Sequence, residues 1–152
     1  AMLRNISSRF KYSCFVNIVE EMELNLYPES QRSVLFDLLS YANKIELNRL
    51  VLTTHSPYVI NYLTLAAKAF LLTQKISANE TLQERIKEVV PADSAIDPAR
   101  LQIYELKDGG VFRLSTYEGL PSDENFLNIQ LGVTNELFDQ LLEIEQEFDY
   151  KN

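Results

Sequence analysis

The stretch VNIVEEMELNLYP, residues 16–28, decides how the fold of this chain is interpreted. It begins as a run of apolar, partly β-branched residues and meets three glutamates within four positions, Glu20, Glu21 and Glu23. A run without apolar-polar alternation is typical of a strand that is covered on both faces. The sequence therefore predicts a buried strand over residues 14–19 that opens directly into a cluster of negative charge.

A second short apolar run, residues 50–54, predicts another buried strand. Between the two runs, residues 29–45 repeat apolar side chains at the i, i+3, i+4 spacing of one helical face. The positions expected to face inward are Val34, Leu35, Leu38, Leu39, Ala42 and Ile45. A helix between two buried strands usually makes a parallel pair with a right-handed crossover. We therefore predict an α/β fold built on a parallel strand–helix–strand unit.

The rest of the chain predicts further helices and one β-hairpin. Ser56 and Pro57 can begin a helix that runs to about residue 75, and a shorter charged helix follows near residues 81–89. LQIYEL, DGG and VFRLST, residues 101–116, predict a hairpin because glycine supplies the positive φ of its turn. After a break at which Ser122 can cap a short helix, an acidic amphipathic helix is expected over residues 134–148, with these side chains inward: Leu137, Leu141, Leu142 and Ile144.

Length and composition limit the class of protein. The chain has 152 residues, 46% of them hydrophobic, which predicts one domain over residues 2–152, with Ala1 set aside as a tag remnant. The net charge of −8 argues against direct contact with nucleic acid, since such contact needs clustered Lys and Arg. No apolar segment reaches the roughly 18 residues of a membrane span. The single cysteine, Cys14, is expected in the core of a protein in a reducing compartment, the cytoplasm.

Two groups of polar residues follow the two predicted strands. Glu20 and Glu21 end the first strand, and His55, the single histidine, follows the second in THSP. Taken alone, the acids can simply enter solvent and the histidine can bond a helix N-terminus. The carboxyl ends of parallel strands share one edge of the sheet, where open α/β sheets bind ligands. A carboxylate pair and an imidazole at that edge suit the polarisation of water beside a phosphate, with Mg²⁺ balancing the charge of the acids.

The stretches IVEEMELNLYPESQ and LVLTTHSPYVIN resemble the C-terminal half of ABC-type ATPase domains of the SMC, RecF and OLD-like group, also called AAA family ATPases. The resemblance covers residues 15–62 and implies a partial P-loop NTPase fold that, when intact, binds and hydrolyses ATP with Mg²⁺. It implies that Glu20 takes the Walker B position beside Mg²⁺ and that Glu21 is the catalytic base. By the same resemblance, His55 is the switch histidine that senses the γ-phosphate.

Some positions extend the resemblance and others depart from it. Glu23 matches a second acid that follows the Walker B pair, and Ser56 matches the start of the next helix, where a structural role is as well supported as a functional one. Met22 stands where the family usually has proline, and Tyr27 where it usually has histidine. The turn after the first strand is therefore expected to differ in shape from the family pattern.

The positions of the glycines indicate that the phosphate-binding half of the expected site, the Walker A loop, is missing from this sequence. A Walker A loop, GxxxxGK[ST], cradles phosphates with closely approaching backbone N–H groups. All four glycines follow His55 in the sequence: Gly109, Gly110, Gly119 and Gly132. We therefore expect the C-terminal portion of a larger ATPase, cut from it or encoded as a truncated frame. Alone, this portion is expected to be inactive, to bind ATP weakly or not at all, and to hold no Mg²⁺. Its expected partners are the missing N-terminal Walker A segment and, because unpaired strands seek partners, further copies of itself.

Two other functions stay open. A catalytically silent interaction module would keep the ATPase fold and use its acidic helices to bind a partner. A small Mg²⁺-dependent phosphohydrolase or nuclease would use the glutamates alone, and it is less favoured because no third cluster of ligands has a useful spacing. An in-frame GxxxxGK[ST] motif upstream of Met2 would favour the ATPase over the silent module.

Overall fold

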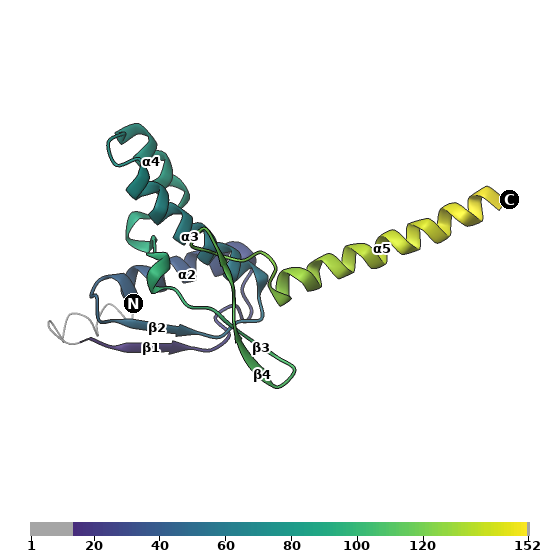
Figure 1. Cartoon of the computed structure of the whole chain (residues 1–152), viewed down its shortest axis with the longest axis horizontal. Coiled ribbons are helices and arrows are strands. Elements are labelled where there is room, and N and C mark those ends of the chain that lie inside the picture. Colours follow the sequence, from purple (N-terminus) through teal and green to yellow (C-terminus); the bar gives the residue numbers. More distant parts are fainter. Residues whose placement is uncertain (1–13, 152) are drawn as a thin grey trace.

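The computed structural model describes residues 14–151 and is built on a strand–helix–strand–helix unit (Figure 1). Strands β1 (Val16–Val19) and β2 (Arg49–Leu52) pair in parallel, and helix α2 (Pro28–Asn43) connects them. The register places Val16 opposite Arg49 and Val19 opposite Leu52, so both strands end at the same edge. The predicted mixed α/β fold with a parallel pair is thus confirmed.

The core lies between α2, helix α3 (Pro57–Lys75) and one face of the strand pair. Both helices begin at a proline, whose fixed φ suits the first helical position. The inward face of α2 differs from the expected one, because Phe36 is buried, Val34 is 37% exposed, and Ile45 lies beyond the end of the helix. Phe36 makes an edge-on ring contact with Tyr62 of α3, at 6.4 Å between centroids, which accounts for its burial.

The other face of the strand pair is uncovered within residues 14–151, which corrects the expectation of strands covered on both faces. Val16 and Ile18 of β1 are 61% and 69% exposed, and Val51 of β2 is 47% exposed. Their neighbours on the opposite face pack against the core: Val19, Leu50 and Leu52. Cys14 is also exposed, not in the core as expected, because alternation puts it on the same face as Val16 and Ile18.

Helix α3 leads into shorter elements and then the predicted hairpin. They are α4 (Glu80–Val89), the 3₁₀ turns η1 (Ala92–Ser94) and η2 (Pro98–Arg100), the hairpin β3 (Tyr104–Lys107) with β4 (Gly110–Arg113), and the short pair β5 (Thr116–Tyr117) with β6 (Leu120–Pro121). Asp108 and Gly109 form the hairpin loop with φ of 50° and 74°, as a type I′ turn requires. The hairpin is confirmed, and Gly110 belongs to its second strand.

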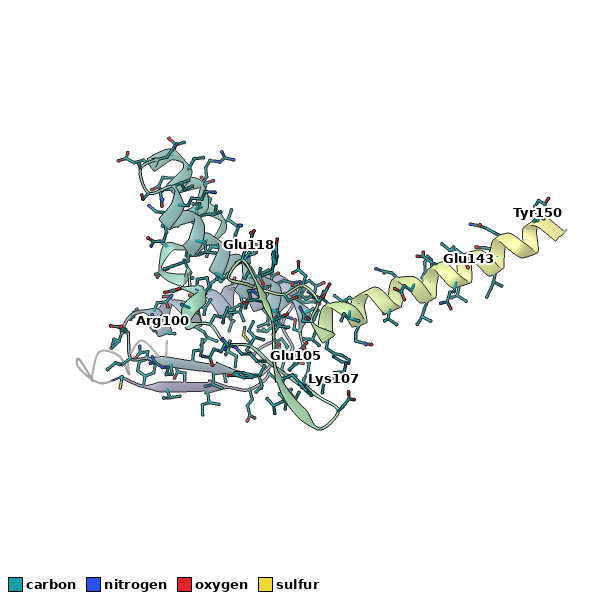
Figure 2. The ribbon with its side chains drawn as sticks, viewed as in Figure 1. Arg100, Glu105, Lys107, Glu118, Glu143 and Tyr150 are labelled. Atoms are coloured by element: carbon teal, nitrogen blue, oxygen red, sulfur yellow. The ribbon has the colours of Figure 1, made fainter. Side chains whose placement is uncertain are left out.

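Helix α5 (Phe126–Lys151) begins well before residue 134 and extends away from the other elements (Figure 1). Its start is capped by Asn125, whose Oδ1 accepts the Asn128 N–H at 3.0 Å. The separate short helix expected after Ser122 is the first part of α5. The side chains expected to face inward are instead 38–65% exposed: Leu137, Leu141, Leu142 and Ile144. That expectation was wrong because none of the other elements within residues 14–151 lies along this part of α5, as the positions of Glu143 and Tyr150 also show (Figure 2). None of the helices described here combines the length and apolar character needed to cross a bilayer.

Candidate functional site

Glu21 occupies a tightly held turn directly after β1. Its φ is 46°, in the left-handed region that side chains with a Cβ seldom adopt. Its backbone N–H donates to Thr53 twice, to the carbonyl oxygen at 3.0 Å and to Oγ1 at 3.1 Å. The residue that follows β2 therefore holds the unusual conformation that follows β1, as such conformations require.

His55 and Glu21 come together at this edge of the sheet. The His55 Nε2 atom lies 3.6 Å from Glu21 Oε1, and the two side chains are 83% and 41% exposed. A polar contact this exposed contributes at most about 0–1 kcal/mol to stability. The contact between His55 and Glu21 therefore adds little to the stability of the fold. It does place an imidazole and a carboxylate close enough to contact the same water molecule or phosphate oxygen.

Glu20 is exposed and forms no hydrogen bond or ion pair with the residues that the structure describes. The same residues hold no group of three or more His, Cys, Asp or Glu side chains arranged for a metal. Mg²⁺ in phosphate-binding sites commonly uses one or two protein carboxylates together with water and the phosphates. A single uncommitted carboxylate such as that of Glu20 fits that mode of binding.

Glu23 makes the shortest contact between the two loops. Its Oε1 accepts the backbone N–H of His55 at 2.5 Å. Its Oε2 is buried and has no hydrogen-bond partner among the described residues. The sequence singled out Glu23 by its place in the motif, but a contact with a backbone N–H leaves no trace in side-chain patterns.

Gln31 is a part of this region that sequence reasoning missed. The Ser56 hydroxyl does not cap α3; it is buried and donates to Gln31 Oε1 at 2.7 Å, while Gln31 Nε2 donates to the Leu26 carbonyl at 2.9 Å. Gln31 thereby ties the start of α2 to the start of α3. A polar residue on the inward face of a predicted helix was the one available signal.

The turn after β1 is anchored by Met22, which is 7% exposed and joins the core. Tyr27, at the entry to α2, is 84% exposed. A buried thioether thus fixes the loop that carries the glutamates, where proline would fix it by restricting φ.

One family of known proteins matches this part of the chain. The model of the family described as "AAA domain, putative AbiEii toxin, Type IV TA system" matches residues 16–61, which contain β1, α2, β2, both loops of the site and the start of α3. No curated protein and no solved structure matches the chain. Over residues 16–61 the chain is therefore similar to an AAA, P-loop ATPase-type domain.

Proposed function

We propose that this chain supplies the water-activating side of an ATP-hydrolysing site of the ABC and SMC-like type. The observation that supports this most is the approach of His55 Nε2 to Glu21 Oε1, 3.6 Å apart, where two parallel strands end together. These residues lie within the segment that is similar to an AAA domain. Ligands of open α/β sheets bind at this edge.

Each polar residue of the edge has a distinct role in the proposal. Glu21 orients the attacking water and accepts its proton, and His55 donates a hydrogen bond to the γ-phosphate. Glu20 would hold Mg²⁺, which would supply positive charge to neutralise the phosphates. The exposure of all three side chains supports these roles, because a nucleotide needs an open approach to them.

A larger domain completes the site in this proposal. The exposed face made by Val16, Ile18 and Val51 supports it, because three large apolar side chains on one sheet face are usually covered. We propose that the covering segment carries the Walker A loop, that the intact protein works in the cytoplasm, and that residues 2–152 alone bind ATP weakly or not at all. Within residues 14–151, β1 and β2 pair only with each other, and strand edges left without a partner favour association between copies of the isolated chain.

The decisive experiment measures ATP binding and ATP hydrolysis by the full-length protein carrying Glu21→Gln. Binding should persist, because the variant keeps the shape of the side chain, while turnover should fall roughly 10²- to 10⁴-fold with the loss of the base. Glu143→Gln on α5 is the matched control, since it removes one exposed carboxylate far from the site (Figure 2). Unchanged turnover in Glu21→Gln would remove Glu21 from the role of base.

A catalytically silent interaction module is the second candidate. The exposed apolar side chains of α5 favour it, since Leu141 and Ile144 are 63% and 65% exposed. The DNA upstream of Met2 separates the two proposals. An in-frame GxxxxGK[ST] motif supports the ATPase, whereas the absence of both that motif and a complementing chain supports the silent module.

A further inference from the structure

We propose that Glu23 is a positioning residue that sets the direction of the His55 imidazole by holding the backbone of the loop after β2. The functional meaning rests on the proposed role of His55 in ATP hydrolysis. The contact itself, from the His55 N–H to Glu23 Oε1 at 2.5 Å, does not depend on that role. Glu23 touches neither substrate nor water in this account; it acts through His55.

The two loops of the site brace each other in both directions. The Glu21 N–H in the first loop donates to Thr53 in the second. The His55 N–H in the second loop donates back to Glu23 in the first. Glu21, proposed to act on the attacking water, and His55, proposed to bind the γ-phosphate, therefore each have their backbone held by a residue from the opposite strand end.

One oxygen of the Glu23 carboxylate is buried although the residue as a whole is only partly buried, so Glu23 is more than a solvent-facing acid. Its Oε2 is shielded from water and lacks a donor among the described residues. Desolvating a carboxylate oxygen without a partner is costly. The short, charge-assisted bond through Oε1 is the interaction that offsets this cost, so the loop is arranged around that bond.

The imidazole of His55 has little else to direct it. It is 83% exposed, and its nearest charged partner is Glu21 at 3.6 Å. The next residue is held separately, because the Ser56 N–H donates to Thr54 Oγ1 at 2.9 Å and the Ser56 hydroxyl bonds Gln31. Loss of the Glu23 contact should therefore loosen His55 while α3 stays in place.

Amide hydrogen exchange of the whole 152-residue chain, followed by NMR without nucleotide, tests the contact. In Glu23→Ala the His55 amide should exchange roughly ten- to a hundred-fold faster, the effect expected when a hydrogen bond to a charged acceptor is lost. Glu23→Gln should give a smaller increase, because a neutral oxygen can still accept the bond. Glu29→Ala is the matched control, since Glu29 is an exposed acid of the same region, and it should leave His55 unchanged.

The positioning role has its own readout, made simple by the single histidine of the chain. Glu21→Gln should shift the imidazole resonance of His55 in the otherwise unaltered chain, and this shift should largely vanish in the Glu23→Ala background. An unchanged His55 exchange rate in both Glu23 variants, or an undiminished shift, would overturn the proposal. If Glu23→Ala fails to fold, Glu23→Gln decides by the same two measurements. Because no ATP is present, this result is independent of whether the intact protein hydrolyses ATP.

Discussion

Helices α3 and α5 carry similar apolar patterns but meet opposite surroundings. In α3 the apolar face is buried, with Val59 and Leu63 at 0% and 9% exposure. In α5 the corresponding side chains Leu137 and Leu141 are 56% and 63% exposed. Helical periodicity therefore indicates which face of a helix seeks a partner, whereas the partner itself is a property of the surrounding structure.

The contacts of the two helices explain the difference. Helix α3 packs against α2 and α4, and its first residues follow the loop that carries His55. Helix α5 meets the other elements near its first turn, where the Phe126 N–H donates to Glu105 Oε1 at 2.6 Å. The proposed site thus lies on the packed part of the molecule, whereas α5 extends away from that part (Figure 1) and its apolar side chains are exposed.

The largest expected effect separates matched leucines of the two helices. Leu63→Ala should lower the free energy of unfolding by about 2–4 kcal/mol, because it opens a cavity in the core. Leu141→Ala should change it by less than about 0.5 kcal/mol, since its side chain is already in water. Urea denaturation followed by circular dichroism at low protein concentration measures both. Equal losses would show that α5 is packed as firmly as α3.

The polar residues that precede the two helices provide a smaller contrast. Ser56→Ala should lower the free energy of unfolding by about 1–3 kcal/mol, because the variant removes the hydroxyl that donates to the buried Gln31 Oε1. Asn125→Ala removes the cap of α5 and should cost roughly 1 kcal/mol, mainly as fraying of that helix.

Amide hydrogen exchange distinguishes a local loss of α5 from global unfolding. Core amides such as that of Leu35 serve as the internal control, since this residue is fully buried in α2. If Asn125→Ala lowered the protection of the Leu35 amide as much as Ser56→Ala does, α5 would belong to the same cooperative unit as the core.

Sequence reasoning succeeded where local chemistry decides the outcome. Proline at position 57 marks the start of α3, and the Asp108-Gly109 pair specifies the hairpin turn. The meeting of Glu21 and His55 followed from the shared edge of two parallel strands. Their roles in catalysis stay predictions.

It failed where the outcome depends on packing across the fold. Phe36, and not Val34, is buried in the core because its ring packs against Tyr62. Whether the outer face of β1 is covered depends on which other elements pack against the strand pair. The hydrogen bond between His55 and Glu23 uses the backbone N–H of His55, a donor that every residue except proline carries. No pattern of side chains along the chain predicts such a contact.

The smallest expected effect is a difference in stability between Gly and Ala variants, which should have opposite signs at Glu21 in the site and at Glu143 in α5. At Glu21, where φ is 46°, glycine should be more stable than alanine by about 1 kcal/mol, because a Cβ is strained in the left-handed region. At Glu143, within α5, alanine should be more stable than glycine by about 0.5–1 kcal/mol.

The comparison of Gly with Ala at one position cancels the loss of the glutamate side chain, including the exposed pair of Glu21 with His55. Denaturation midpoints measure the first pair of variants, and the helical circular dichroism signal measures the second. If alanine were the more stable residue at both positions, the backbone at Glu21 would be unstrained. If glycine is favoured at Glu21 alone, then the proposed base has a strained backbone conformation. The two hydrogen bonds from its N–H to Thr53 maintain that conformation, and the packing of the surrounding elements offsets the free energy of the strain.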